Sequence, residues 1–450
     1  MTSFSGKRVT VIGLGESGLA ASRVLLSEGA SVLVSEESEL RDVAERAAAA
    51  EDAGADVRAG GHAPGHLNDA DLVVVSPGVP ESAEVILWAN ARNIPIWSEL
   101  ELGARLARCP YVAVTGTNGK TTTTRLIAEA MRRDGLDAIA CGNVGYPFSL
   151  AAAEGHEALA VEASSFQLRF HETLHPKVSV LLNVAEDHTD WHGSPEAYVA
   201  AKRRIYVRQE EDDVHVGNRD DEAGSEISRD APCRVVWFTS GPPVVGEAGY
   251  EDAELVWRDS MGGHALGRPF SGSPAHRANA AAAAAAALSF GVGVEAVGAA
   301  VRETAPPPHR GETVAEVEGV SFVDDSKATN PHAALSTIRG FRDAVLICGG
   351  RSKGIDLRPM AEATPHLAAV VVIGEAARDL ERVFASRIPT HRAGSIEEAV
   401  QLAAGMARPG KAVVLAPGCS SWDMFKDYAE RGERFARAAR ALGEEKVPRG

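Results

Sequence analysis

The chain has 450 residues, more than one hydrophobic core usually supports, so we expect two or three domains. Its 45% hydrophobic and 24% charged residues are typical of a globular protein and exclude a largely disordered chain. The formal net charge of −16 argues against non-specific binding to nucleic acid or to an anionic membrane, so we expect small-molecule partners.

The five cysteines are odd in number and show no Cys-x-x-Cys spacing, which indicates neither a disulfide framework nor a thiolate zinc site. The N-terminus lacks the layout of a signal peptide, and no run of about 18 apolar residues could span a membrane. These features predict a cytoplasmic protein that is not attached to a membrane.

Short apolar, β-branched runs alternate with longer alanine-rich segments along the chain. The runs are VTVIGLG, DLVVVSPG, YVAVTGTNG, KVSVLLNV, DAVLICGG, AAVVVIG and KAVVLAPG. This alternation predicts an α/β fold of βαβ units with parallel sheets, and the alanines at 280–287 predict a close-packed helix. Prolines interrupt the pattern near residue 109 and at 303–312, so we predict three domains, over residues 1–108, 109–308 and 309–450.

The first strand runs into a glycine-rich turn, Gly13-x-Gly15-x-x-Gly18, followed by a predicted helix. Such a turn offers backbone N–H groups and a helix N-terminus to a diphosphate. Glu36, about twenty residues on, suits the ribose of a dinucleotide, so a nicotinamide cofactor, another nucleotide diphosphate and an empty structural turn all remain open here.

A second turn, TGTNGKTTTT, is a stronger signal. Its glycines let the backbone wrap a phosphate chain, Lys120 can reach the β- and γ-phosphates, and Thr121 can ligate Mg²⁺. Val114 stands where the strict phosphate-loop pattern has its first glycine. We interpret the segment as an ATP loop.

Two further strand-like runs end in polar groups, at Glu162 in LAVEASSFQL and at Asn183 to His192 in VLLNVAEDHTDWHG. Ligands of open α/β sheets bind at the carboxyl ends of the strands. Glu162 and His188 are therefore candidate contacts for Mg²⁺ or substrate, although either alone could be a solvated loop residue.

In this order, TGTNGKTTT, VEASSFQL, NVAEDHTDWHGSPEAYVAAKRRI, PPPHRGE and DDSKATNP resemble the ATP-dependent Mur ligases of bacterial cell-wall synthesis, relatives of folylpolyglutamate synthetase. The resemblance spans nearly the whole chain. It implies a Rossmann-like N-terminal domain, a central ATPase-like domain with a phosphate loop and a parallel sheet, and a Rossmann-like C-terminal domain. Within the family, CGGRSKGIDL and APGCSSWDMFKDYAERG are most similar to the member that adds D-glutamate to UDP-N-acetylmuramoyl-L-alanine.

The family's chemistry activates a carboxylate with ATP as an acyl phosphate, which an amine then attacks. The resemblance implies ATP and Mg²⁺ as cofactors, a metal site of Thr121, Glu162, His188 and Lys202, and a catalytic set of Lys120, Glu162, His188 and Lys202. Lys202 would be carbamylated. The implied ATP contacts are Gly116, Thr117, Asn118, Gly119, Lys120, Thr121, Thr122, Asn279, His309, Arg310 and Asp325.

The same resemblance implies the substrate contacts. Those of the UDP substrate are Gly15, Ser17, Ser35, Ser76 and Asn143, and those of D-glutamate are Lys327, Lys353, Ser421 and Tyr428. Glu36 and Glu37 depart from the family's usual layout and would repel a diphosphate if they faced it, and His276 replaces an expected asparagine. We expect a monomer whose C-terminal domain closes over the nucleotide.

Two other functions are compatible with parts of the sequence. A nicotinamide dehydrogenase would explain the first 40 residues but leaves the phosphate loop and Lys202 without a role. A nucleotide-binding regulator would need the loops but not Glu162, His188 and Lys202 together. Phosphate release that depends on both an amino acid and a UDP-sugar would separate an enzyme from the regulator.

Overall fold

The computed structural model describes residues 4–187 and 189–444. Contacts divide the chain into two compact units. The first holds Met1–Val184, Trp191–Pro269 and Asn279–Thr304, and the second holds Ala185–Asp190, Phe270–Ala278 and Ala305–Gly450.

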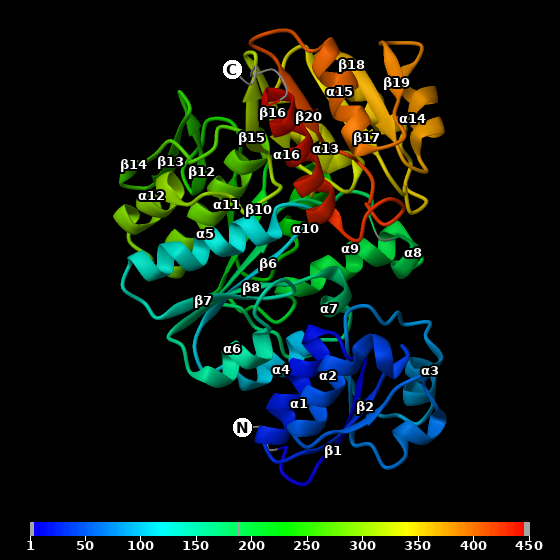
Figure 1. Cartoon of the computed structure of the whole chain (residues 1–450). Coiled ribbons are helices and arrows are strands. Elements are labelled where there is room, and N and C mark those ends of the chain that lie inside the picture. Colours follow the sequence, from blue (N-terminus) through cyan, green and yellow to red (C-terminus); the bar gives the residue numbers. More distant parts are fainter. Residues whose placement is uncertain (1–3, 188, 445–450) are drawn as a thin grey trace. The chain divides into compact units, whose positions relative to one another are not determined.

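The N-terminal part of the first unit is a five-stranded parallel sheet in the order β3-β2-β1-β4-β5 (Figure 1). Its strands are β1 Arg8–Ile12, β2 Ser31–Ser35, β3 Asp56–Arg58, β4 Leu72–Val75 and β5 Ile96–Ser98. Its helices are α1 Glu16–Ser27, α2 Leu40–Asp52, α3 Glu84–Ala91 and α4 Glu99–Leu106, with a 3₁₀ turn, η1, at Pro64–Leu67. This strand order is that of a doubly wound fold, in which ligands bind where the order reverses, here beside β1.

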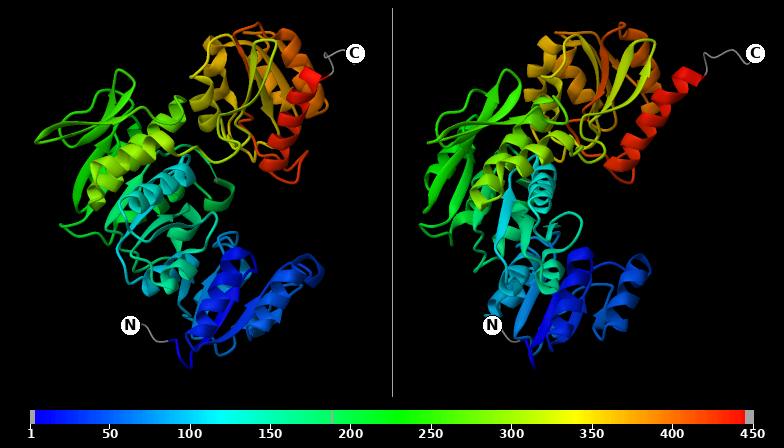
Figure 2. Two further views of the ribbon diagram at one scale, coloured as in Figure 1. Left: turned by 60° about the vertical axis from the view of Figure 1, so that its left-hand side comes forward. Right: turned by 90° about the vertical axis from the view of Figure 1, so that its left-hand side faces the viewer.

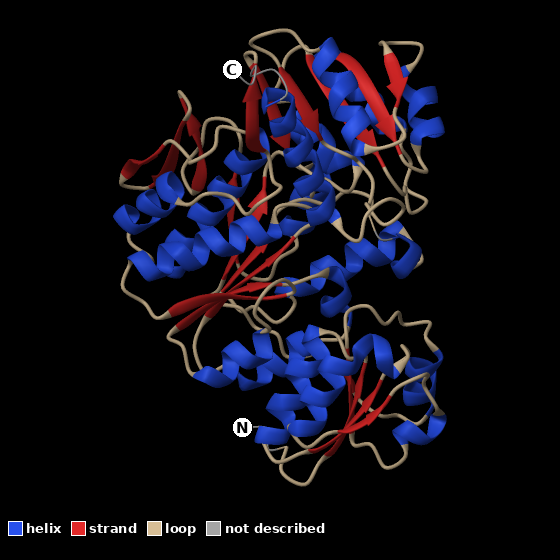
Figure 3. Cartoon of the chain, viewed as in Figure 1, coloured by secondary structure: helices blue, strands red, loops and turns tan. Residues whose placement is uncertain are grey.

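Alternate residues of the central strands face two separate cores. Val74 belongs to the core that includes α1, α2 and α4, whereas Val73 and Val75 belong to the core under α3 and η1. Because both faces of the sheet are covered, its strands are nearly continuous apolar runs. Figures 2 and 3 show the helices on either side of this sheet.

A nine-stranded sheet, in the order β14-β13-β12-β11-β10-β9-β6-β8-β7, forms the rest of the first unit. Its strands are β6 Tyr111–Thr115, β7 Ala138–Gly142, β8 Ala158–Glu162, β9 Val178–Leu181, β10 Val214–Asn218, β11 Arg234–Phe238, β12 Glu247–Glu251, β13 Glu254–Asp259 and β14 Gly262–Gly267. The helices along this stretch are α5 Lys120–Arg133, α6 Phe148–Glu154, α7 Ser165–Arg169, α8 Thr189–His192, α9 Pro195–Arg203, η2 Arg204–Tyr206, α10 Glu222–Arg229, α11 Pro274–Phe290 and α12 Val294–Glu303. Strands β6 to β11 run parallel to their neighbours, and β12 runs parallel to β11.

The last three strands of this sheet, β12 to β14, are antiparallel, which the alternating pattern did not predict. Asp252 and Ala253 connect β12 to β13 with φ angles of +47° and +71°. Two successive positive φ angles are those of a tight hairpin turn that usually takes Asn-Gly or Asp-Gly. Because the turn here lacks glycine, the sequence carried little signal for it.

The second unit contains a six-stranded sheet in the order β15-β16-β20-β17-β18-β19. Its strands are β15 Glu312–Val317, β16 Val320–Asp324, β17 Ala344–Gly349, β18 Leu367–Ile373, β19 Thr390–Arg392 and β20 Ala412–Leu415, and its helices are α13 Pro331–Ile338, η3 Arg358–His366, α14 Ala377–Phe384, α15 Ile396–Met406 and α16 Tyr428–Glu444. Strand β15 is antiparallel to β16, and the other strands are parallel to their neighbours.

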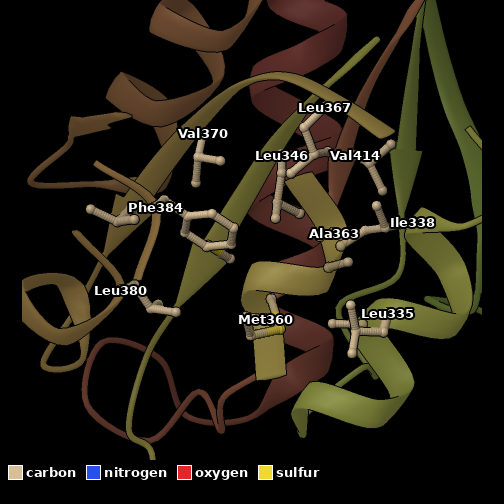
Figure 4. Close-up of a cluster of buried hydrophobic side chains, with 14 of the residues drawn as sticks. Leu335, Ile338, Leu346, Met360, Ala363, Leu367, Val370, Leu380, Phe384 and Val414 are labelled. Carbon is tan, nitrogen blue, oxygen red and sulfur yellow. The ribbon is translucent and has the colours of Figure 1, made fainter. Parts of the chain in front are cut away.

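Figure 4 shows the core on one face of this sheet, where Leu346 and Val414 pack against Met360 and Phe384. The opposite face packs on α15 and α16. With two covered faces, the sheet leaves its strand ends as the places where polar groups can reach a ligand.

The predicted α/β fold with parallel sheets is confirmed, and each of the seven apolar runs forms a strand. The alanines at 280–287 lie within α11 and are all buried, as predicted. The bounds of the three predicted domains stay a prediction. In the residues that the structure describes, no helix is both long and apolar enough to cross a bilayer.

Candidate active site

The predicted phosphate loop lies between strand β6 and helix α5. The strand ends at Thr115 and the helix begins at Lys120, so the free N–H groups of the first helical turn point toward the loop. Gly119 has a φ of +90°, and a Cβ atom there would lie 2.1 Å from Oδ1 of Asn279. Because only glycine fits, the loop keeps the compact shape that can wrap a phosphate chain.

Asn183, two residues after the neighbouring strand β9, holds this loop in place. Its Oδ1 accepts the N–H of Asn118 at 2.9 Å, and its Nδ2 donates to the carbonyl of the same residue at 3.1 Å. The hydroxyl groups of Thr117 and Tyr198 are 3.0 Å apart. These contacts fix the loop backbone before any ligand binds, which lowers the ordering cost of binding.

The two predicted catalytic lysines meet at one carbonyl oxygen. Lys120 donates from Nζ to the carbonyls of Gly116 and Thr117, both at 2.9 Å. Lys202, on helix α9, donates from Nζ to the same Gly116 carbonyl at 2.8 Å, and its side chain is 1% exposed. The Lys202 ammonium also lies 4.4 Å from the centre of the Tyr198 ring. The fold thus brings Lys202 beside the phosphate loop.

Glu162 ends strand β8, one strand away from the loop, since the sheet register pairs it with Val114. Its side chain is 2% exposed, and Oε1 accepts from Nδ2 of Asn143 at 3.1 Å. Oε2 is buried and has no hydrogen-bond partner in the described part of the chain. A buried carboxylate oxygen without a donor is costly, and a hard cation such as Mg²⁺ would satisfy it. The residues present therefore fit a magnesium ion.

Of the other predicted metal ligands, the structure describes Thr121 and Lys202. His188 lies outside the described residues. Thr121 is half-buried in the first turn of α5. Across residues 4–187 and 189–444, no three His, Cys, Asp or Glu side chains gather into a metal site. A metal at Glu162 would therefore need hydroxyl, carbamate or phosphate oxygens as well.

The glycine-rich turn after β1 is shaped by two of its three glycines. Gly13 has a φ of +86°, and a Cβ atom at Gly18 would lie 2.0 Å from the Gly13 carbonyl oxygen. That carbonyl also accepts from the Ser76 hydroxyl at 3.0 Å. Gly15, in contrast, is exposed and has open space where a Cβ would stand, with Ser17 half-buried beside it. The protein itself does not require glycine at 15, whereas a closely approaching ligand would.

Glu36 turns inward and does not face this open side. Its Oε2 accepts the N–H of Leu14 at 2.5 Å, and its Oε1 accepts the N–H of Ser38 at 2.8 Å. Burial alone would raise the pKa of Glu36, but these backbone hydrogen bonds outweigh burial and lower it. Both oxygens of this carboxylate are thus engaged by the protein's own backbone, and the residue is 8% exposed.

Ser35, a predicted contact of the UDP substrate, is fully buried. Its hydroxyl is 2.8 Å from Nδ1 of both His62 and His66. The Ser35 hydroxyl thus contacts two imidazole rings. The sequence analysis did not single out these histidines, although the segment GGHAPGH places them four residues apart. Ser35 stays a predicted contact.

In the second unit, the predicted nucleotide residues His309 and Arg310 precede β15, and Asp325 follows β16. His309 has a φ of +63°, and its Nδ1 lies 2.6 Å from Oδ2 of Asp324. Asp325 is buried and accepts a short hydrogen bond from the Thr337 hydroxyl. Burial raises the pKa of Asp325 to about 7, with the neighbouring Asp324 carboxylate adding to the shift. Its carboxyl group points toward Thr337 in this structure.

The predicted D-glutamate contacts gather at the carboxyl ends of adjacent strands of the third sheet. Lys327 follows β16, Lys353 follows β17 and Ser421 follows β20, and these strands are neighbours in the order β16-β20-β17. The Lys327 ammonium lies 4.1 Å from the centre of the ring of Tyr428, which begins α16. The four predicted residues thus lie at one edge of one sheet.

Comparison with known proteins decides the family. Residues 7–98, 114–259 and 309–419 match, in this order, the MurD-like N-terminal domain, the Mur ligase middle domain and the glutamate ligase domain of Mur ligases. The chain is 42% identical to the UDP-N-acetylmuramoylalanine–D-glutamate ligase of Frankia casuarinae, over 98% of this chain and 95% of that protein. The chain belongs to the Mur ligase family.

A second relative, the enzyme of the same name from Trichlorobacter lovleyi, is 38% identical over 97% of this Mur ligase and 99% of its own length. Solved structures show the same fold at lower identity. A MurF ligase from Thermotoga maritima in complex with ADP aligns with a TM-score of 0.62 and 18% identity, over 99% of this chain and all of that one. A pseudomurein peptide ligase type C from Methanothermus fervidus gives a TM-score of 0.61 and 17% identity, over 97% of this chain.

Arg431 is a structural residue of this Mur ligase that the sequence analysis missed. It is fully buried, and its guanidinium donates to Ser326 Oγ at 2.9 Å, to the Ser326 carbonyl at 2.8 Å and to the Cys419 carbonyl at 3.2 Å. Burial lowers the pKa of Arg431 to about 10. It ties the segments after β16 and β20 together, and as one of several arginines along α16 it had no distinguishing signal in the sequence.

Proposed function

We propose that this Mur ligase joins D-glutamate to the carboxyl group of UDP-N-acetylmuramoyl-L-alanine and converts ATP to ADP and phosphate. The 42% identity to a ligase of that name, over nearly the full length of both chains, supports this proposal most directly. The phosphate loop beside a buried, unpartnered carboxylate oxygen supports it independently. We further propose that the enzyme acts as a cytoplasmic monomer in peptidoglycan precursor synthesis.

The reaction needs activation because a carboxylate is a poor electrophile. Transfer of the γ-phosphoryl group of ATP to the substrate carboxylate gives an acyl phosphate and ADP. The amine of D-glutamate then attacks the acyl carbon, phosphate leaves, and the amine loses a proton to give the amide. Both steps gather negative charge, so preorganised cations and N–H donors are the main catalytic requirement.

We assign the ATP phosphates to the loop between β6 and α5. Lys120 would release its two carbonyl contacts and bind phosphate oxygens, and the first turn of α5 would donate its free N–H groups. The assigned residues of this unit are Gly116, Thr117, Asn118, Gly119, Lys120, Thr121, Thr122 and Asn279. When bound, Mg²⁺ would neutralise phosphate charge, held by Thr121, Glu162, His188 and Lys202.

Lys202 would act as a carbamate. Its amine and Lys120 both lie at the Gly116 carbonyl, where two ammonium ions would repel each other. The Lys202 ammonium would first lose one proton, and reaction of the resulting amine with CO₂ would release a second proton and leave a carbamate anion that can ligate Mg²⁺. The remaining N–H can still donate to the Gly116 carbonyl.

The substrates are assigned to separate sheet edges. The turn with Gly15, Ser17 and Ser76 would hold the UDP group, with Ser35 behind it and Asn143 near the reacting carboxylate. D-glutamate would contact Lys327, Lys353, Ser421 and Tyr428, so that cationic donors meet its two carboxylates.

A phosphate-release assay with UDP-N-acetylmuramoyl-L-alanine, ATP and a panel of amino acids tests the proposal. We expect release to require all three substrates and to favour D-glutamate over L-glutamate by on the order of 10- to 100-fold, because inversion leaves buried donors unpaired. Comparable turnover with L-glutamate, or preference for a diamino acid, would overturn the assignment. Omission of each substrate in turn is the control for uncoupled ATP hydrolysis.

A further inference from the structure

Trp422 is a large aromatic side chain that the assigned site does not use. It lies in the segment between β20 and α16, one residue after Ser421, and is 63% exposed. A single exposed aromatic residue is unremarkable by itself. The contacts of the neighbouring residues define the position of Trp422.

The segments after β17 and β20 are joined by a short antiparallel bridge between Arg351 and Ser420. Each backbone N–H donates to the other residue's carbonyl at 3.0 Å, and the Ser420 hydroxyl donates to the Arg351 carbonyl at 3.1 Å. Two residues beyond the bridge on either side stand Lys353 and Trp422. The bridge therefore anchors the two backbone segments from which these side chains project.

The residues on both sides of Trp422 are anchored. Ser421 is 2% exposed, and its carbonyl accepts the N–H groups of Met424 and Phe425 at 3.1 and 2.9 Å. Asp423 accepts the N–H of Glu375, which follows β18, at 2.9 Å. With its neighbours fixed on both sides, the Trp422 backbone can turn little, and its indole is held on the outer side of the segment.

Lys353 faces this indole. Its Nζ lies 5.2 Å from the centre of the Trp422 ring, within the range of a cation–π contact. Its φ of +55° is rare for a residue with a side chain. Strain of this kind persists where the surrounding structure imposes it, and it is frequent at ligand sites.

We propose that Trp422 is a positioning residue for the amino-acid substrate, whose indole face holds the Lys353 ammonium ready to meet a carboxylate of D-glutamate. This inference rests on the proposed function. An ammonium on a four-carbon chain otherwise loses much conformational freedom when it binds a carboxylate. The indole reduces that loss, and its exposed face also offers an apolar surface to the methylene groups of the substrate.

The test is a pair of substitutions that distinguishes the effect of the aromatic ring from the effect of side-chain volume. Trp422→Leu keeps an apolar side chain but removes the aromatic face, whereas Trp422→Phe keeps an aromatic face. For Trp422→Leu we expect the KM for D-glutamate to rise about two- to fivefold, with kcat and the KM values for ATP and the UDP substrate unchanged. Trp422→Phe should lie between the wild type and Trp422→Leu.

A second readout follows the indole directly. With the UDP substrate and ADP present, D-glutamate should change the emission of the wild type but not that of Trp422→Phe, in which the five other tryptophans supply the background. Identical titration curves for the two proteins would overturn the inference. So would an unchanged KM for D-glutamate in a Trp422→Leu protein with the wild-type melting temperature.

The outcomes distinguish this inference from the proposed function. If the wild type does not ligate D-glutamate, the proposed function fails. If it does and Trp422→Leu matches it, the function stands and the role of Trp422 fails. Because the indole is mostly exposed, we expect Trp422→Leu to fold, and Trp422→Tyr provides a second ring-retaining variant if the melting temperature falls.

Discussion

Lys202, Arg203 and Arg204 are consecutive, yet one of them alone reaches the phosphate loop. The Lys202 amine donates to Gly116 from a buried position, whereas Arg203 is half-exposed and pairs with Asp230 at 2.9 Å. Each helical step turns the side chain by about 100°, which separates neighbours onto different faces. A guanidinium at 202 would stay charged and could not react with CO₂, so this position distinguishes lysine from arginine by chemistry as well as by size.

Lys202→Arg should lower ligase turnover on the order of 100-fold or more, because it keeps the charge but removes the amine that forms a carbamate. Lys202→Ala should be partly rescued by acetate, which can occupy the vacated place. Steady-state phosphate release with and without acetate measures both effects. Arg203→Lys is the matched control and should retain activity; full activity in Lys202→Arg would rule out the carbamate.

Asp325 should make the second unit less stable as pH rises. Its folded pKa of about 7 lies above the ordinary value of 3.8, so the folded protein holds the proton more tightly than the unfolded chain does. This contribution is complete below about pH 4 and is lost as pH rises through 7. Urea unfolding without nucleotide, from pH 5 to pH 8, should show wild-type stability falling relative to Asp325→Asn. Parallel pH profiles for the two proteins would contradict this account.

At the scale of elements, the strands and the glycine turns could be predicted because they depend on local sequence patterns. Strands buried on both faces are continuous apolar runs, and the glycine turns after β1 and β6 mark where those strands end. The β12–β13 hairpin could not be predicted because its turn residues, Asp252 and Ala253, adopt positive φ without glycine. The contacts of Asn183 and Arg431 join segments far apart in the chain, so no local pattern reports them.

Gly119→Ala should weaken ATP binding through the shape of the phosphate loop. A side chain at φ +90° costs about 1–3 kcal/mol, and the new Cβ would collide with the Asn279 amide. Calorimetric titration should show loss of ATP affinity with binding of the UDP substrate retained. Gly15→Ala is the reciprocal control, expected to affect the UDP substrate and not ATP. Wild-type ATP affinity in Gly119→Ala would show that the loop has more freedom than this structure indicates.

At the scale of the whole molecule, all five cysteines are unpaired, and Cys141, Cys348 and Cys419 are buried. Burial raises the pKa of Cys233 to about 11 and that of Cys419 to about 12. A disulfide-exchange reagent should therefore titrate at most the two half-buried thiols, Cys109 and Cys233, in the native protein, and all five in denaturant. Reductant should leave the melting temperature unchanged; rapid native reaction of more than two thiols would contradict the burial.

From the sequence, the predicted site residues could be placed on strands, helices or loops, but their hydrogen-bond partners could not be predicted. The sequence placed Glu162 at a strand end, for example, but not its hydrogen bond to Asn143 or its unpartnered oxygen. The sequence left open whether Glu36 faces the ligand side of its turn, and the structure shows its carboxylate accepting the N–H of Leu14. Such orientations depend on packing across the sheet, which composition and spacing do not encode.

The alanine run of α11 is buried on every side, since residues 280–287 are all at most 3% exposed. Most helices of a globular protein present one face to water, and that face accepts substitutions freely. This one has no such face, and each added methyl group would press against a neighbouring element. Tolerance to substitution along these eight residues should therefore be uniformly low, without the 3.6-residue periodicity of a surface helix. This low-complexity alanine run is then the segment in which the fewest substitutions are tolerated.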